Sequence, residues 1–345
     1  MHPRDVLLCA QAGSVVLPVC DHYSGVEARI KKSLALQAEM LQEFGACVFD
    51  ATLDCEDGAP VGGELDHANM VLASANTAWE AIEKIANASK PPSQKQRTGQ
   101  RIKQRIGVRV HAVDHAAFEQ DVQLLVKGSS QWAYIMLPKV ESPADVQRAL
   151  KAIDVAGGQS IPLHVLIESS AAIHRVFEIA AHPRVQSMSF GLMDFVSSHG
   201  GAIPSEAMTS SGQFSHPLVL RAKTEISAAC HAFGKVPSHC VVTEFADTLA
   251  MQSAASMASK TLGYTRMWSI HPAQIRPIIA AFSPTEKETE DATKIIAAGA
   301  QSDWAPTSFN GQLHDRASYR YYWQVLERAH RTGRAMPAEA QAYFA

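Results

Sequence analysis

The sequence lacks the marks of several protein classes, and each absence narrows what the chain can be. Its six cysteines are scattered, with no Cys-x-x-Cys pair and no framework spacing, which favours reduced thiols over a disulfide scaffold. No apolar run reaches the length of about eighteen residues that a membrane-spanning helix needs. The first residues lack a basic segment followed by a sustained apolar one, which argues against a secretory signal. We therefore expect a cytoplasmic protein.

The sequence also lacks a large excess of either positive or negative charge. The formal net charge is −3 and 19% of residues are charged, so we expect no dedicated nucleic-acid surface. The Pro/Gln/Lys/Arg-rich stretch Lys90–Gln104 is predicted to be an exposed insertion. With 46% hydrophobic residues, the chain can bury a large core. Its length fits one barrel-type domain with an appendage, or two domains.

Short apolar runs alternate with stretches of helical periodicity. Runs of about four to eight apolar residues suit strands buried in a parallel sheet, whereas Glu27–Phe44 has apolar residues at helical spacing and a glycine after it. A polar turn is predicted at Asp21–Gly25. The candidate strands lie within residues 15–20, 46–53, 106–111, 132–137, 162–168, 187–194, 238–243 and 267–272. This alternation predicts an α/β fold, a (β/α)8 TIM barrel, rather than a doubly wound sheet.

Ionisable side chains collect at the C-terminal ends of these candidate strands, the barrel face where active sites are built. Glu168 and Asp194 end two consecutive strands and would meet at one edge. Two hard oxygen ligands without a thiolate nearby suit Mg²⁺. The alternative is that each carboxylate caps the turn that follows it. The full set is Asp54, Glu56, Asp57, Arg109, His111, Lys139, Glu141, Glu168, Asp194 and His271.

Six short segments, most of them at the ends of the candidate strands, together resemble a known protein family. They occur in the order and approximate spacing found in the citrate lyase β-subunit-like proteins. The chain resembles this group of the HpcH/HpaI aldolase superfamily, which also holds malyl-CoA and methylmalyl-CoA lyases, over roughly residues 14–290. The resemblance implies a (β/α)8 barrel, a Mg²⁺ ion, a homo-oligomer, and cleavage or formation of a carbon–carbon bond in an acyl-CoA or 2-oxo acid. The segments are Leu53–Ala59, Val108–His111, Leu137–Ser142, Leu166–Ser169, Phe190–Asp194 and Ile270–Ile275.

The resemblance also implies roles for single residues. Glu168 and Asp194 match the metal ligands, and Arg109 matches the arginine that meets the substrate's carboxylate and carbonyl oxygens. Glu56 and Asp57 match an acidic pair beside the metal's water shell, and Asp57 is our candidate for the general base. Carbon–carbon cleavage leaves an enolate, which a hard cation beside a guanidinium stabilises. For Arg109 the alternative is a structural ion pair with one of these carboxylates.

Other positions carry looser expectations. Lys139 and His271 are assigned to substrate binding, while a supporting role is the alternative for Lys139 and for Glu141. A metal site made of His22, His111, His239 and His271 is also conceivable, although their spacing has no metal-site signature.

The chain departs from the family pattern at three places. His111 stands where the family usually has Asn, Pro18–Tyr23 replaces an early Pro-Gly loop, and His239 replaces an aspartate in the seventh-strand segment. Those positions help to fix the acyl-CoA end of the substrate in the family.

These observations predict a Mg²⁺-dependent carbon–carbon lyase. Its substrate would be a 3-hydroxyacyl-CoA, such as a malyl- or citryl-type thioester, and its products a 2-oxo acid and an acyl-CoA. One alternative is an aldolase that releases pyruvate or another 2-oxo acid from a free hydroxy acid. An alternative of another class is a non-catalytic partner subunit that binds ligand without turnover.

The end of the chain is predicted to be an appendage. We expect the barrel domain to cover residues 1–300, and a linker with a helical extension to cover 301–345. Within the helix predicted at Arg316–Thr332, an aromatic stripe recurs at i, i+3, i+4 and i+7 and must be buried against something. It would dock on its own barrel or across a neighbouring subunit near the active site. The second case predicts a homo-oligomer (dimer, trimer or hexamer). The stripe is Tyr319, Tyr322, Trp323 and Leu326.

Overall fold

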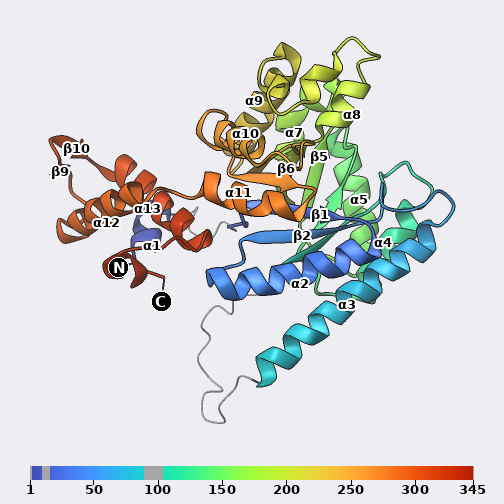
Figure 1. Ribbon diagram of the computed structural model, residues 1–345, viewed down its shortest axis with the longest axis horizontal. Helices are drawn as coiled ribbons and strands as arrows, with labels where there is room; N and C mark the ends of the chain where they lie inside the picture. Colours follow the sequence, from blue (N-terminus) through green and yellow to red (C-terminus); the bar gives the residue numbers. More distant parts are fainter. Residues whose placement is uncertain (1, 10–15, 89–103, 345) are drawn as a thin grey trace.

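The computed structural model describes residues 2–9, 16–88 and 104–344. They form a closed barrel of eight parallel strands surrounded by helices, with a smaller body beside it (Figure 1). Each strand pairs with the next in sequence, and β8 pairs with β1 through Cys20 and Met267. The predicted (β/α)8 barrel is therefore confirmed. The expected insertion at Lys90–Gln104 lies outside the described residues, except for Gln104.

The strands and helices alternate around the barrel. The strands are β1 (Cys20–Ser24), β2 (Phe49–Asp54), β3 (Ile106–Arg109), β4 (Ile135–Leu137), β5 (Leu163–Ile167), β6 (Val185–Phe190), β7 (Val236–His239) and β8 (Arg266–Ser269). The helices around them are α2 (Glu27–Phe44), α3 (Glu64–Ala88), α4 (Phe118–Gly128), α5 (Pro143–Val155), α6 (Ser170–His174), α7 (Val176–Ala180), α8 (Leu192–Ser197), α9 (Pro217–Ala232), α10 (Thr248–Lys260) and α11 (Pro272–Phe282). As predicted, α2 ends at Gly45, whose φ of 63° is left-handed.

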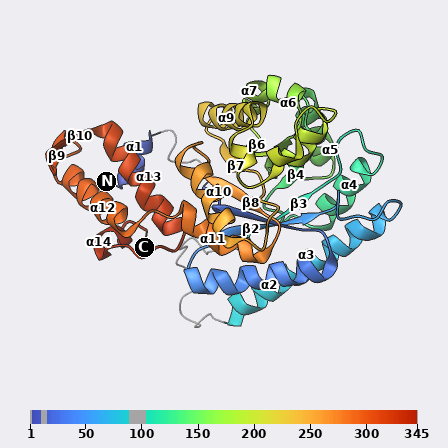
Figure 2. The same cartoon turned by 45° about the horizontal axis from the view of Figure 1, so that its top comes forward.

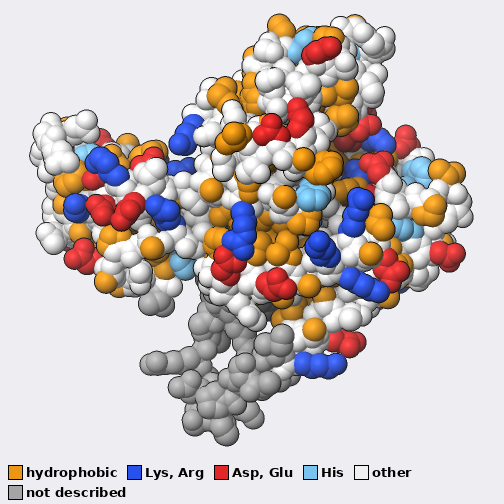
Figure 3. Space-filling view, in the orientation of Figure 1, with side chains coloured by type: hydrophobic (Ala, Val, Ile, Leu, Met, Phe, Trp, Pro, Cys, Tyr) orange, Lys and Arg blue, Asp and Glu red, His pale blue; other side chains and the backbone are white. Residues whose placement is uncertain are grey.

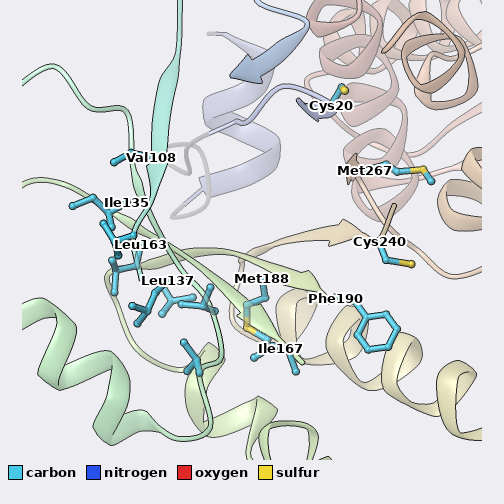
Figure 4. Packing of buried hydrophobic residues seen from close by; sticks show 14 of the residues in the cluster. Cys20, Val108, Ile135, Leu137, Leu163, Ile167, Met188, Phe190, Cys240 and Met267 are labelled. Atoms are coloured by element: carbon cyan, nitrogen blue, oxygen red, sulfur yellow. The ribbon is translucent and has the colours of Figure 1, made fainter. Parts of the chain in front are cut away.

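Strand alternation separates an outer layer from the barrel interior. In β5, Leu163 and Ile167 pack in the large cluster that includes the helices, whereas Leu166 packs with Tyr134 and Trp268 in a separate cluster. Figure 4 shows apolar side chains of the outer layer following the barrel wall from strand to strand. The barrel is therefore held by a continuous apolar layer between the sheet and the helices.

The first strand was predicted wrongly. β1 covers Cys20–Ser24, so the predicted polar turn at Asp21–Gly25 is mostly strand, while Val15 lies outside the described residues. Sequence reasoning places charged residues in turns because an unpaired buried charge is costly. Here the buried Asp21 accepts a hydrogen bond from Trp268 Nε1 (3.1 Å) and pairs with Arg266 (2.9 Å). Each of the other strands overlaps its predicted range.

The smaller body contains both ends of the described chain (Figure 1 and Figure 2). It consists of α1 (Pro3–Leu8), α12 (Glu286–Gln301), a hairpin of β9 (Thr307–Phe309) and β10 (Gln312–His314), α13 (Arg316–Arg331) and α14 (Ala338–Gln341). The stretch 305–311 is therefore not a simple linker. Asn310 and Gly311 form the turn of this hairpin, with φ values of 50° and 77°.

The aromatic stripe of α13 is buried within this smaller body. Tyr319, Trp323 and Leu326 have no exposed surface. They pack with Leu7 of α1 and Ile295 of α12, in a hydrophobic cluster separate from the barrel core. The expectation that the stripe docks on its own barrel was therefore wrong, and contact of this segment with a neighbouring subunit stays a prediction. A homo-oligomer stays a prediction, now without support from the stripe.

The packing of the smaller body bears on where the barrel domain ends. Because α12 belongs to the second cluster, the packing favours a boundary before residue 286, and the division at residue 300 remains a prediction.

Acidic and basic side chains are interspersed over the face shown in Figure 3. Among the described residues, no helix combines the length and apolarity needed to cross a membrane.

Candidate active site at the carboxyl end of the barrel

Arg109, the last residue of β3, is surrounded by carboxylates. Its Nε donates to Asp54 Oδ1 (2.8 Å), its Nη1 pairs with Glu56 Oε2 (2.8 Å) and its Nη2 donates to Asp57 Oδ2 (2.7 Å). Burial lowers the pKa of Arg109 to about 10, although the negative charges of Glu168 and Asp194 partly oppose this decrease. The guanidinium therefore stays protonated at neutral pH. The ion pairs that sequence reasoning raised as an alternative are therefore present.

The three carboxylates around Arg109 differ in how firmly they are held. Asp54 is fully buried and also accepts backbone N–H groups of Glu56 (2.9 Å) and Gly58 (2.7 Å). Glu56 is also bound by Lys139 Nζ (2.7 Å), and burial raises the pKa of Glu56 while this ammonium opposes the rise. The Asp57 side chain is 69% exposed, compared with 9% for Glu56. Asp57 is thus the partner of Arg109 that an incoming anion can displace most easily.

Glu168 and Asp194 come from neighbouring strands of the barrel. Glu168 directly follows β5 and is buried, whereas Asp194 follows β6 in the first turn of α8 and is exposed. Burial, together with the negative charge of Asp194, raises the pKa of Glu168 to about 7. The two predicted ligands thus lie close enough to each other and to Arg109 for their charges to interact.

Lys139 links the two halves of the site. It has a φ of 52°, a left-handed backbone conformation that is uncommon for a side chain of this size. In this conformation its backbone N–H donates to Glu168 Oε2 (2.8 Å), while its Nζ reaches Glu56 Oε1 (2.7 Å). Lys139 therefore orients a carboxylate on each side of the barrel mouth, which is the supporting role weighed from the sequence. Substrate binding by Lys139 stays a prediction.

The remaining predicted residues have local partners. Glu141 accepts a hydrogen bond from Ser169 Oγ (2.7 Å), and His271 Nδ1 accepts one from Ala273 N (3.2 Å) at the start of α11. In the structure the His271 side chain caps the start of α11, and substrate binding by His271 stays a prediction. His111 Nδ1 lies 2.6 Å from Asp121 Oδ2. Burial lowers the pKa of His111, but the hydrogen bond and charge of Asp121 outweigh this effect and raise it overall.

Two residues at this face were missed by sequence reasoning. Asp54 was noted as a strand-end carboxylate but was given no role, although it fixes Nε of Arg109. Tyr23 was assigned to a turn, yet its ring centroid lies 4.6 Å from Arg109 Cζ and its hydroxyl accepts a hydrogen bond from Nη2. The alternation of side chains along β1 would have pointed to Tyr23 only if the strand had been placed correctly.

Comparison with known proteins identifies the family. The sequence profile of the HpcH/HpaI aldolase/citrate lyase family matches residues 64–272. The chain belongs to this family. The resemblance stated from the sequence is thereby confirmed, and the chain is a carbon–carbon lyase of the HpcH/HpaI type. This finding disfavours the non-catalytic partner subunit.

Individual relatives of the lyase differ in similarity. The L-malyl-CoA/β-methylmalyl-CoA lyase of Rhodobacter capsulatus is 34% identical over 242 residues, which cover 65% of this chain and 76% of that protein. The crystal structure of a citrate lyase from Burkholderia xenovorans LB400 covers 99% of both chains at 46% identity, with a TM-score of 0.77. Protein CitE from Mycobacterium tuberculosis, in complex with magnesium, acetoacetate and coenzyme A, covers 91% of this chain and 98% of its own. At 21% identity and a TM-score of 0.64, CitE shares the fold.

The donor set of the lyase fits a hard divalent cation. Glu168 and Asp194 are acidic oxygen donors, the negative charge of Asp194 adds to the cost of ionising Glu168, and a cation between the two side chains would offset that cost. Within residues 2–9, 16–88 and 104–344, no three His, Cys, Asp or Glu side chains group as a metal-binding set. An ion at this position would therefore take its other ligands from water or substrate, as Mg²⁺ commonly does.

Gly191 provides the space for the Glu168 carboxylate, and we expect its replacement to impair the lyase. A Cβ added at Gly191 would lie 2.2 Å from Glu168 Oε1 and 2.7 Å from Cδ, so Gly191→Ala must displace the carboxylate. Mg²⁺-dependent turnover should fall by about a hundredfold, the scale of a 1 Å misplacement at a reacting centre. Steady-state kinetics at saturating Mg²⁺ would measure the loss. Ser205→Ala, at an exposed position in the 3-10 helix Ser205–Met208, serves as the control, and equal turnover in both variants would contradict the prediction.

Proposed function

We propose that the lyase holds Mg²⁺ between Glu168 and Asp194 and cleaves, or forms, a 3-hydroxyacyl-CoA. The products of cleavage are a 2-oxo acid and an acyl-CoA. The observation that carries this proposal is one buried guanidinium beside two repelling carboxylates at a single barrel mouth. The 34% identical malyl-CoA lyase supports the thioester class. Bound Mg²⁺ would supply a Lewis acid for the oxygens of the 2-oxo acid and for the developing oxyanion.

Arg109 binds the carboxylate of the substrate in this proposal. Its Nη2 points at the exposed Asp57, so a substrate carboxylate can take that position while Asp54 keeps Nε in place. A guanidinium offers parallel N–H groups to a carboxylate, which a lysine ammonium cannot do. Arg109 thereby orients the 2-oxo acid end of the substrate.

Asp57 is the proposed general base. Once the substrate carboxylate has replaced it on Arg109, its carboxylate is free to accept a proton. In the cleavage direction it takes the 3-hydroxyl proton, the carbon–carbon bond breaks to leave the 2-oxo acid, and the electron pair of that bond forms the enolate of the acyl thioester. The enolate then takes up one proton at carbon to give the acyl-CoA. In the condensation direction a base takes the methyl proton instead. Glu56 suits this role less well, because both Arg109 and Lys139 hold its carboxylate.

A ligand screen tests the proposal directly. Thermal unfolding would be followed with CoA, acetyl-CoA, glyoxylate, pyruvate and oxaloacetate, each with and without Mg²⁺, because a ligand that binds the folded state raises its Tm. We expect a 2-oxo acid to raise Tm only with Mg²⁺, and acetyl-CoA to add a further increase. Stabilisation by 2-oxo acids without any response to CoA compounds would favour the aldolase acting on a free hydroxy acid. No response to any 2-oxo acid would contradict both.

Arg109→Lys is expected to lower kcat/KM by roughly two orders of magnitude, about 3 kcal/mol, on the scale of losing one oxyanion donor. The lysine keeps the charge but loses the paired N–H groups. Arg221→Lys is the matched control, because Arg221 is exposed on α9 and pairs only with Glu225 among the contacts described for it. Steady-state kinetics with both variants would measure the difference. A loss smaller than about fivefold for Arg109→Lys would place this residue outside the site.

A further inference from the structure

Tyr23 touches Arg109 through both its ring and its hydroxyl. Arg109 Cζ lies 4.6 Å from the ring centroid, and Nη2 donates a hydrogen bond to the hydroxyl oxygen. A cation over an aromatic face is attracted by the ring electrons, and a hydrogen bond from a charged donor adds direction to that attraction. The two contacts together restrain where the guanidinium can lie and how it is turned.

Tyr23 also contacts a buried residue of the barrel interior. Its ring stacks on Trp268, with centroids 5.8 Å apart and planes inclined by 21°. Trp268 Nε1 donates to Asp21 Oδ2 (3.1 Å), and Asp21 pairs with the fully buried Arg266 (2.9 Å). A continuous column of contacts therefore runs from the ion pairs inside the barrel to the guanidinium at its mouth.

The partners of Nη2 show when Tyr23 matters most. Nη2 carries two N–H groups, and its partners are the exposed Asp57 and the hydroxyl of Tyr23. When a substrate carboxylate takes the place of Asp57, the contact with Tyr23 remains. Asp54 holds the other end of the guanidinium at Nε. The guanidinium is then fixed at both ends while one side faces the ligand.

We propose that Tyr23 is a positioning residue of the lyase, which holds the guanidinium of Arg109 in the orientation that receives the substrate carboxylate. The proposal rests on the binding of that carboxylate by Arg109, as proposed above. Because Tyr23 acts through Arg109, its loss should affect the 2-oxo acid end of the reaction. In the condensation direction, KM for the 2-oxo acid should rise while KM for the acyl-CoA stays unchanged.

The first test needs no activity. In the free protein, hydrogen exchange of the Arg109 Nε–H would be followed by ¹⁵N NMR, with the signal assigned by its disappearance in Arg109→Lys. Tyr23→Leu removes the ring and the hydroxyl, whereas Tyr23→Phe keeps the ring and serves if the leucine variant does not fold. We expect exchange to be about tenfold faster in Tyr23→Leu, because local opening then costs less. Tyr321→Phe, at an exposed site on α13, is the control. Unchanged exchange in the Tyr23 variants would overturn the proposal.

The second test is a double-mutant cycle. Tyr23→Phe should lower kcat/KM for the 2-oxo acid by about tenfold in the wild-type background, but add little to Arg109→Lys, because residues that act as a unit are not additive. Equal losses in both backgrounds would show that Tyr23 acts independently of Arg109 and would overturn the proposal. If the wild-type protein has no Mg²⁺-dependent lyase activity, the proposed function fails, and the exchange measurement still decides whether Tyr23 positions Arg109.

Discussion

Glu168→Gln and Asp194→Asn are each expected to remove Mg²⁺-dependent turnover, by about three orders of magnitude or more, while the fold is kept. Either substitution keeps the shape of the side chain but removes one of the two charges that would hold the ion. The effect should exceed that of Arg109→Lys, because loss of the ion removes its Lewis acid and also one anchor of the 2-oxo acid. Steady-state kinetics over a range of Mg²⁺ concentrations would measure it.

The stability of these variants separates a lost ion from a lost fold. Burial raises the pKa of Glu168 from 4.5 to about 7, so the folded protein disfavours the ionised carboxylate. This cost is absent well below pH 4.5 and fully present above about pH 7, so the neutral Gln should leave Tm unchanged or slightly higher at pH 8 without metal. Asp194 is exposed, and its replacement should change Tm little. Glu178→Gln, at an exposed site on α7, is the control. Full turnover in either ligand variant, or an ion bound elsewhere in a Mg²⁺-soaked crystal, would contradict the assignment.

The position of the site could be predicted because of barrel geometry. In a parallel barrel the carboxyl ends of consecutive strands meet, so the carboxylates after β5 and β6 had to lie near each other and near the end of β3. Strand limits matter little for this argument: Asp194 lies in the first turn of α8 instead of at a strand end, and it still acts electrostatically on Glu168. Family resemblance then supplied roles that geometry alone leaves open.

Contacts inside the barrel could not be predicted in the same way. Asp21 and Tyr23 have the polarity of a turn, and only residues far away in sequence make them suitable for a strand. Asp21 forms an ion pair with Arg266 of β8, and Tyr23 contacts both Arg109 of β3 and Trp268 of β8. A local pattern contains no information about such partners, so the strand was placed too early and Tyr23 was missed.

The smaller body shows a different limit. Its helix α13 was predicted correctly from periodicity, and Asn310–Gly311 is a recognised hairpin signal that was read as a linker. The burial of Trp323 against the N-terminal helix α1 joins residues more than three hundred positions apart, which periodicity cannot reveal. The spacing of the stripe therefore correctly predicted that these side chains are buried, but it did not predict which residues they pack against.

Arg266→Met is expected to destabilise the lyase by about 3–5 kcal/mol, the usual cost of removing one partner from a buried ion pair. Arg266 has no exposed surface and pairs with Asp50 (2.6 Å) and Asp21 (2.9 Å) inside the barrel. Methionine fills a similar volume but leaves both carboxylates without this cation. Asp50 retains Arg105 (2.8 Å), whereas Asp21 retains only neutral donors among its described contacts. Tm measured by calorimetry should fall by about 10 °C, at roughly 2–4 °C per kcal/mol for a large domain.

Two further variants show whether this loss comes from burial of unpaired charge. Arg276→Met removes an arginine that also pairs with a carboxylate, Glu43 (2.6 Å), but both side chains are about half exposed, at 58% and 48%. Such a pair contributes at most about 1 kcal/mol, so Tm should change by only a few degrees. Adding Asp21→Asn and Asp50→Asn to Arg266→Met removes the orphaned charges and should restore part of the lost stability. If Arg266→Met unfolds within about 2 °C of the wild-type protein, or if the triple variant is less stable than Arg266→Met, pairing of the buried charges does not stabilise the barrel.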